Sequence, residues 1–231
     1  MPLKLEIETK LSSFFKEKFD VKETTIVPST DYSKLTFGNT GLISELCFLF
    51  VDIRESSKLH ERYGFANAAR IYESFHEINV RLINTNNGKV RAFDGDRIMA
   101  VFSGDNKCTN AVKTAMQINW AIRNILNTHL DKPLKCGLGI DYGKTLITKV
   151  GKGRDENNQD LIWVGQACNY ASHYCQEGND SIIISTQTYN KMNESVKISS
   201  SNKNMWVERI ITLKSGKQIK CYESNWGWTF E

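Results

Sequence analysis

The sequence predicts an α+β fold in which antiparallel hairpins and crossover helices surround a ferredoxin-like centre. Segments with apolar residues at helical spacing alternate with the short apolar runs that are typical of strands. Two pairs of these runs flank glycine-containing turns, as hairpins do. The order is strand, helix, two strands, helix, strand, helix, strand and a final hairpin, which favours the α+β class. The 231 residues, 40% hydrophobic and 24% charged, describe an ordinary globular chain.

The N-terminal part predicts an arm that precedes the main domain. Residues 3–19 place leucine, isoleucine and phenylalanine at helical spacing, so we expect a short amphipathic helix that packs on another surface, for example a partner subunit. Residues 20–44 mix proline, glycine and polar side chains and predict a linker or irregular arm. We therefore divide the chain into an N-terminal helix and arm, residues 1–44, and a main domain, residues 45–231.

The first half of the main domain contains a buried strand, two helices and a hairpin. Residues 46–53, LCFLFVDI, form a continuous apolar run that ends in an acid, the pattern of a strand covered on both faces. Apolar residues at 3–4 spacing predict helices over residues 65–84 and 108–128, and Gly88 would close the first of them. Between these helices, VRAF and RIMAVF flank a glycine-containing acidic turn, so residues 90–102 predict a hairpin.

The second half predicts more strands and one further helix. The chain as a whole contains no internal repeat and no low-complexity segment. The expected elements are strands over 134–143 and 145–151, a polar loop over 153–160, a short strand at 162–165, a helix over 166–176, a strand over 181–185 and a hairpin of 205–213 with 217–223.

The composition argues against several classes of function. Thirty basic and 26 acidic residues leave a net charge of +4, too small a bias to predict nucleic-acid binding. The six cysteines include no CxxC pair and no zinc spacing with the four histidines, so we expect reduced, mostly buried thiols. The N-terminus lacks the apolar core of a signal peptide, and no run approaches the ~18 apolar residues of a membrane span. These features favour a cytoplasmic protein that contacts neither nucleic acid nor membrane.

Two aspartates are candidate metal ligands, and the first stands at the end of a buried strand, where an acid is costly unless it is paired or bound to metal. Asp52 ends the first buried strand, and Asp96 lies in the turn of the next hairpin. A ferredoxin-like sheet places this strand beside the hairpin, so we expect both carboxylates at one sheet edge. There they would hold two divalent cations, Mn²⁺ or Mg²⁺. The alternative is that Asp52 caps the following helix and Asp96 serves only the turn.

The turn after Asp52 is expected to contact the phosphates of a nucleotide. Its backbone amides enter a helix, and such amides receive phosphate oxygens. Two cations that clamp a triphosphate would move a phosphoryl group with little covalent help from the protein. The turn residues expected to contact a nucleotide are Ile53, Arg54, Glu55, Ser56 and Ser57.

Three ordered motifs resemble those of the class III adenylate and guanylate cyclases. FVDI at residues 50–53 resembles the first metal motif of this family, and GD at 95–96, followed by RIMAVF, resembles the second. GQACNYA at 165–171 resembles the family's G-x-x-x-N-x-A-x-R element. The resemblance covers about residues 44–225 and implies the catalytic fold of these cyclases.

The resemblance also implies a reaction and a set of roles. Asp52, Asp96 and the carbonyl of Ile53 would hold the metals while the ribose 3′-oxygen attacks the α-phosphorus. Asn169 would position the ribose. In this family the metal acids come from one subunit and the asparagine element from the other. One chain here carries one copy of each, so a homodimer with composite active sites is implied.

The base-reading positions differ from those of the purine cyclases. Those enzymes place a lysine and a polar residue where this chain has Ala92 and Ile162, and neither side chain hydrogen-bonds a purine edge. Losing both readers argues against selection of ATP or GTP. The strings VRAFDGD and NNQDLIWVGQACNYAS are more similar to the bacterial antiphage pyrimidine cyclases. These enzymes make cyclic UMP or cyclic CMP from UTP or CTP, and the product activates a separate effector.

Family frequency alone favours UTP over CTP. Two further alternatives stay open at this point. The first is a purine cyclase with unusual base readers. The second is an inactive cyclase fold that binds nucleotide as a sensor.

Several cations are candidates for stabilising the transition state. The purine enzymes carry an arginine where this chain has His173, and a protonated His173 would replace it only weakly near neutral pH. Lys217 of the final hairpin is the second candidate, and a solvated hairpin lysine is the alternative reading. The basic segment at residues 152–154 is a third candidate for contact with the triphosphate.

The hairpin and its neighbouring strand offer candidate walls for the base. Arg91 and Arg97 flank the hairpin turn, and an arginine could donate to a pyrimidine carbonyl. Arg91 is one residue from the base-reading position, where strand alternation turns it away from the pocket. Phe50 and Phe93 are possible pocket walls, although an aromatic residue on a buried strand is more often part of the core.

Overall fold

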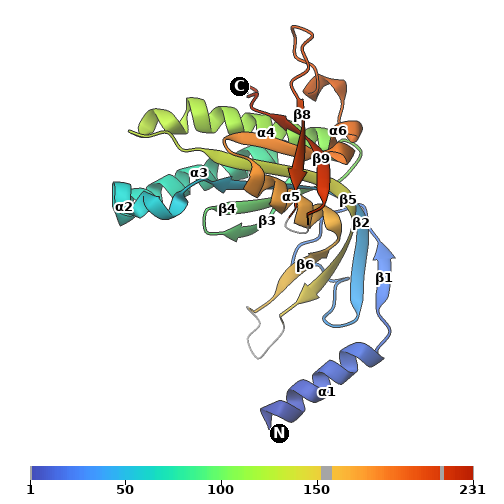
Figure 1. Cartoon of the computed structure of the whole chain (residues 1–231). Coiled ribbons are helices and arrows are strands. Elements are labelled where there is room, and N and C mark those ends of the chain that lie inside the picture. The colour runs from blue at the N-terminus through green and yellow to red at the C-terminus, as the bar shows by residue number, and fades with distance from the viewer. Residues whose placement is uncertain (1, 152–157, 214–215, 231) are drawn as a thin grey trace.

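The structure, a computed structural model, describes residues 2–151, 158–213 and 216–230. A first helix stands apart, and strands and helices alternate after it (Figure 1). The strands are β1 (Asp20–Glu23), β2 (Thr40–Ile53), β3 (Lys89–Asp94), β4 (Arg97–Phe102), β5 (Cys136–Val150), β6 (Asp160–Val164), β7 (Ser181–Ser185), β8 (Val207–Thr212) and β9 (Gln218–Ser224). The helices are α1 (Leu3–Lys16), α2 (Leu59–Tyr63), α3 (Phe65–Thr85), α4 (Lys107–Asn124), α5 (Gln166–Glu177) and α6 (Thr186–Lys191).

All the described strands join one mixed sheet, which helices cover on both faces. The strands follow in the order β3-β4-β2-β5-β7-β9-β8, while β1 pairs with β2 and β6 pairs with β5 outside this path. Helices α3 and α4 pack on one face and α5 packs on the other. The parallel β5–β7 pair is linked through α5, and the other strands of the main path pair antiparallel. This is the α+β arrangement that the sequence predicts.

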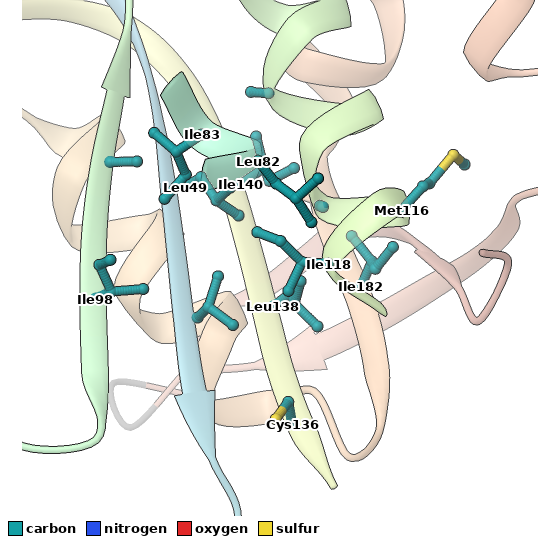
Figure 2. Packing of buried hydrophobic residues seen from close by; sticks show 14 of the residues in the cluster. Leu49, Leu82, Ile83, Ile98, Met116, Ile118, Cys136, Leu138, Ile140 and Ile182 are labelled. Carbon is teal, nitrogen blue, oxygen red and sulfur yellow. The ribbon is translucent and has the colours of Figure 1, made fainter. Parts of the chain in front are cut away.

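Strand β2 is apolar along its length because its side chains alternate between two hydrophobic clusters. Cys47, Leu49 and Val51 belong to the cluster under α3 and α4. Phe48 and Phe50 belong to the cluster under α5. Figure 2 shows the first cluster, which includes Leu49, Leu82, Ile83, Ile98, Met116, Ile118, Cys136, Leu138, Ile140 and Ile182. Asp52 therefore lies on the face that α5 covers, at the point where the hydrophobic run ends.

Helix α5 lies directly on the backbone of β5. A Cβ atom at Gly139 would stand 2.1 Å from the carbonyl oxygen of Ala171, so no other residue fits without moving the helix. The small side chains of Ala167 and Ala171 are buried at this contact. The position of α5 over the sheet is thus fixed by residues that lack bulk on both sides.

The arm is more regular than the sequence predicts. β1 pairs in parallel with Thr40–Ile43, so β2 begins six residues before the expected start at residue 46. Leu35 is buried in the same cluster as Leu42, which ties the arm to the sheet. The pairing of β1 with β2 was not predictable from the sequence, because a short parallel strand of polar residues has no apolar run to mark it.

Two strands expected over residues 134–151 form one continuous strand instead. β5 runs from Cys136 to Val150 and pairs with β2 without interruption through Gly143 and Lys144. The expected boundary between the two strands is absent, because Gly143 faces Ala167 of α5 and stays in the ladder. The second half of β5 then pairs with β6.

Helix α1 extends away from the sheet (Figure 1). None of its residues is buried, and Phe15 is 90% exposed. Its apolar positions are as the helical spacing predicts. Phe14 lies close to Gly38 of the arm, whereas most of the other apolar side chains of α1 face solvent. Among the described residues, no helix is both long and apolar enough to cross a membrane.

Candidate active site

The end of β2 and the β3–β4 hairpin form a cleft of about 550 Å³ that contains both aspartates singled out in the sequence. Asp52 pairs across the strands with Arg97 on β4. Asp96 immediately precedes Arg97 in the hairpin turn, so the antiparallel pairing brings the two acids to one sheet edge. The residues lining the cleft are Asp52, Ile53, Arg54, Glu55, Ser56, Asp94, Gly95, Asp96 and Arg97.

Opposing influences act on the Asp52 carboxylate. Its side chain is 14% exposed, and this burial raises its pKa above the ordinary value. The negative charge of Asp96 raises the pKa further, whereas Arg97 and Arg54 lower it. Two nearby carboxylates repel when both are ionised. A bound cation would remove that repulsion, so the pair is electrostatically suited to one.

The donor set of the cleft fits Mg²⁺ or Mn²⁺. Both side-chain ligands are carboxylates, and Ile53, which is 2% exposed, also borders the cleft. Hard divalent cations prefer such oxygen donors. Within the described ranges, no group of three or more histidine, cysteine, aspartate or glutamate side chains could hold a metal. Mg²⁺ is commonly held by one or two carboxylates together with substrate phosphates and water, and this site matches that mode.

Arg54 is held by three acceptors from its own chain. Its Nη1 atom donates to Asp52 Oδ2 over 3.0 Å, Nε donates to the carbonyl oxygen of Gly178 over 2.7 Å, and Nη2 donates to that of Cys175. The guanidinium occupies space that a side chain at Gly137 would fill. Arg54 therefore joins the end of β2 to the C-terminal end of α5. Its expected contact with nucleotide stays a prediction.

Arg97 lies on the other side of the same carboxylate. Its Nη2 atom is 3.5 Å from Asp52 Oδ2, and Nη1 is 3.4 Å from the hydroxyl of Ser172 on α5. Both distances are at the long limit for a hydrogen bond. The side chain is 24% exposed and lines the cleft.

The turn after β2 leads into a short helix, as the sequence predicts, and its contact with phosphate stays a prediction. Glu55 adopts a left-handed conformation with φ of 56°, and Ser56–Lys58 form a single 3₁₀ turn that no side chain caps. Amides at such a start lack intrahelical acceptors. Tyr72 of α3 donates from its hydroxyl to the carbonyl oxygen of Ser56 over 3.2 Å and so fixes the turn. Ser57 belongs to this turn and does not line the cleft.

The residues of the asparagine element lie outside this cleft, on α5. Asn169 is exposed, and His173, one helical turn further on, is half-buried. The Nε2 atom of His173 is buried and has no hydrogen-bond partner among the described residues. Neither residue lines the cleft of Asp52 and Asp96. A single chain thus presents the expected site residues on separate surfaces.

The base-reading positions are apolar in the structure as well. Ala92 of β3 packs against the cluster under α5, and Ile162 of β6 is 42% exposed. Phe50 is buried in that cluster, as a core residue would be. Arg91 donates to the carbonyl oxygen of Val27 in the arm over 3.2 Å, because a β-bulge between Val90 and Ala92 redirects the strand. A contact between Arg91 and a base stays a prediction.

Lys217 is exposed and borders a different cavity, of about 500 Å³, between α5, β5 and β9. Asp141 of β5 lines the same cavity and is only 5% exposed. Burial raises the pKa of Asp141 to about 6, although hydrogen bonds from Ser185 and the Tyr142 amide lower it. The basic segment at residues 152–154 lies outside the described residues, as does Lys214.

Sequence reasoning missed two of these features. Asp141 was detectable, because an acid inside the apolar string GLGIDYG carries the same signal as Asp52 at the end of its strand. The link from Arg54 to the end of α5 was not detectable. It joins segments more than 120 residues apart, and local patterns contain nothing about such contacts.

A mixed sheet with two acids at one strand end and hairpin, beside a helix that carries an exposed asparagine, agrees with the nucleotide cyclases of class III. Residues 40–223 match the family described as adenylate and guanylate cyclase catalytic domain. The chain therefore belongs to this family. The enzyme class predicted from the sequence, a nucleotide cyclase, is confirmed by this match.

Full-length relatives and solved structures agree with the assignment. The chain is 32% identical to the uridylate cyclase of Xanthomonas perforans over 100% of both chains. It is 28% identical to that of Burkholderia cepacia, over 99% of this chain and 100% of the relative. An adenylyl cyclase structure from P. aeruginosa has a TM-score of 0.68 at 18% identity, covering 80% of this chain and 95% of that one.

A dimeric guanylyl cyclase domain from Blastocladiella emersonii has a TM-score of 0.62 at 14% identity. The alignment covers 79% of this chain and 97% of that one. At this level of identity both structural matches support the fold alone. They confirm the fold class that the sequence predicts.

Proposed function

We propose that this protein is a pyrimidine nucleotide cyclase. It converts UTP, in preference to CTP, to the 3′,5′-cyclic monophosphate and pyrophosphate. The observation that carries the proposal is the apolar character of both base-reading positions, Ala92 and Ile162, which offer no hydrogen bond to a purine edge. The full-length similarity to two bacterial uridylate cyclases supports UTP as the substrate.

In the proposed mechanism the cleft binds the triphosphate and the reacting ribose oxygen. Asp52, Asp96 and the carbonyl of Ile53 would hold two divalent cations, Mn²⁺ or Mg²⁺. When bound, these cations would lower the pKa of the 3′-hydroxyl and neutralise the triphosphate. The amides of the turn after β2 would bind phosphate oxygens. The pair of acids thus supplies binding and charge neutralisation, while the ribose oxygen displaces pyrophosphate in line.

A homodimer would complete the site. Asn169, His173 and Lys217 lie away from the cleft of their own chain, and Asn169 and Lys217 are exposed. A second copy could therefore present them to the cleft. Exposed apolar side chains on β3 and β6, namely Phe93, Ile162 and Val164, support burial of this surface against a partner.

The proposed product is a signal rather than a metabolic end point. A cyclic pyrimidine monophosphate would act on a separate cyclic-nucleotide-binding effector during antiphage defence. The support for this role is the resemblance to the antiphage pyrimidine cyclases together with the full-length similarity to named uridylate cyclases.

The deciding experiment offers each of the four nucleoside triphosphates separately to the full chain with Mn²⁺. Products are identified by chromatography and mass spectrometry, and pyrophosphate is quantified in parallel. We expect cyclic UMP with one pyrophosphate per product, and kcat/KM for ATP and GTP at least about 100-fold lower. Cyclic AMP or cyclic GMP as the main product would refute the pyrimidine assignment. Tight nucleotide binding without pyrophosphate release would indicate a sensor instead.

A further inference from the structure

The proposed reaction needs positive charge near the α-phosphoryl group. Negative charge spreads over the phosphoryl oxygens and the leaving pyrophosphate in the transition state. The position at which the purine cyclases carry an arginine is His173 in this chain. An imidazole is a weaker cation than a guanidinium near neutral pH. Another cation near the two acids would fill this gap.

Two guanidinium groups line the cleft of Asp52 and Asp96, and their surroundings differ. All three nitrogen atoms of Arg54 donate to acceptors within the chain, two of them backbone carbonyls at the end of α5. Moving this side chain would leave those carbonyls without their donor and uncouple the helix from β2. Arg54 is therefore committed to holding the fold together.

Arg97 has no comparable commitment. Its side-chain hydrogen bonds within the described part of the chain, to Asp52 Oδ2 and to Ser172 Oγ, are 3.5 Å and 3.4 Å long. Ion-paired N–H groups and carboxylate oxygens at full strength stand ~2.7–2.9 Å apart. The guanidinium thus keeps donor capacity while it lies in the cleft, next to Asp96 in sequence and opposite Asp52 across the strands.

We propose that Arg97 is a catalytic residue whose guanidinium binds the α-phosphoryl oxygens in the transition state. This inference rests on the proposed function. The ribose 3′-oxygen forms a bond to the α-phosphorus, and the bond from that phosphorus to the bridging oxygen breaks. Its electron pair leaves with pyrophosphate, and the 3′-hydroxyl proton passes to water. Arg97 stays protonated throughout. The cation thus comes from the chain that carries the two acids.

The first test separates kcat from KM. Arg97→Ala should lower kcat about 100-fold, the effect of removing one preorganised donor to a transition state, and change KM less than about threefold. Arg97→Lys keeps the positive charge but not the planar set of donors, so its kcat should lie between those of Arg97→Ala and the unaltered enzyme. Thermal unfolding of each variant is measured alongside, so that a loss of fold is seen directly.

Two matched controls address a structural role. Ser172→Ala removes the helix contact of Arg97 without touching the guanidinium. Arg81→Ala removes an equally charged residue that is exposed on α3 and paired with Glu77. We expect both to keep kcat within about twofold of the unaltered enzyme. If Ser172→Ala reproduces the loss, or if Arg97→Ala retains kcat within about threefold, the proposal is wrong.

A second readout needs no turnover. Inorganic triphosphate is titrated into the enzyme in EDTA by calorimetry, because without divalent cations the arginine faces an unneutralised polyanion. We expect Arg97→Ala to raise the Kd about five- to tenfold and Ser172→Ala to leave it unchanged. If the unaltered enzyme cyclises no nucleoside triphosphate, the proposed function fails, and this titration alone tests whether Arg97 binds phosphate oxygens. An unchanged Kd in Arg97→Ala would then overturn the inference.

Discussion

Two aspartates lie on the α5-covered face of the sheet, at opposite ends of that helix, and they are held in different ways. Asp52 sits near the C-terminal end of α5, in an open cleft with Arg54, Arg97 and a second acid. Asp141 lies under the N-terminal half, beside Gln166 and Tyr170. Its recorded hydrogen-bond donors, the Tyr142 amide and the Ser185 hydroxyl, are uncharged.

Burial raises the pKa of both carboxylates, so a shifted pKa does not distinguish a catalytic acid from a structural one. The difference lies in what surrounds the charge. Two cations and a second carboxylate surround Asp52, and Arg97, unlike Arg54, makes only long contacts that a metal and a triphosphate can replace. The groups that hydrogen-bond Asp141 are neutral, and the lysines that line the same cavity, Lys144, Lys217 and Lys220, are exposed. This comparison predicts opposite consequences when each acid is neutralised.

The largest effect is expected in the cleft. Asp52→Asn and Asp96→Asn preserve the shape of each side chain and remove one negative ligand. Each should lower kcat at least about 1,000-fold, because the remaining acid cannot hold both cations. Far-UV circular dichroism and thermal unfolding should show a folded protein in both cases. Retention of a tenth of the activity by either variant would place the metals elsewhere.

The sequence was sufficient to locate this cleft. The run LCFLFVDI and the hairpin around Asp96 are both local patterns, and an antiparallel neighbour of the first strand brings their ends together. The arginines were a different matter. The donors of Arg54 reach carbonyls of Cys175 and Gly178, and the close packing of α5 on Gly137 and Gly139 brings these segments together.

Two errors in the strand pattern have the same origin. The strands expected over 134–143 and 145–151 are one strand, β5, in which Gly143 provides room for Ala167. Residues 20–23 were interpreted as linker, although they pair with Thr40–Ile43. In each case the glycine or polar residue does mark an unusual position in the chain. The partner that gives it meaning lies elsewhere in the chain, so single-sequence patterns could not supply it.

The second prediction concerns stability at the other end of α5. The folded pKa of Asp141 is raised from 3.8 to about 6, so its stabilising contribution is fully present below pH 3.8 and is lost as pH rises through 6. This shift corresponds to a loss of up to about 3 kcal/mol between pH 4 and pH 8. Asp141→Asn mimics the protonated form and should remove that loss.

The measurement is urea unfolding of Asp141→Asn and of the unaltered enzyme at pH 4.5 and pH 7.5. The difference in unfolding free energy between the two proteins should move in favour of the variant as pH rises, while kcat changes less than about threefold. If the difference in unfolding free energy is the same at both pH values and kcat falls strongly, Asp141 is a catalytic residue and does not differ from Asp52 in role.

The smallest expected signal tests whether the cleft is completed by a second copy of α5. Asp52→Asn and Asn169→Ala should each be inactive alone, since the first lacks a metal ligand and the second lacks the ribose contact. In a mixed dimer one of the two sites combines an intact cleft with an intact helix. Random exchange of equal amounts makes half of the dimers mixed, so about a quarter of the activity should return.

The matched control is a mixture of Asp52→Asn with Asp96→Asn. Both changes lie in the same cleft, so in a mixed dimer each cleft still lacks one acid and no activity should return. Recovery in the first mixture and not in the second requires that the cleft of one chain works with α5 of the other. Asn169 would then act on a cleft that its own chain does not line. If neither mixture recovers after subunit exchange is verified by mass spectrometry, the site is contained within one chain.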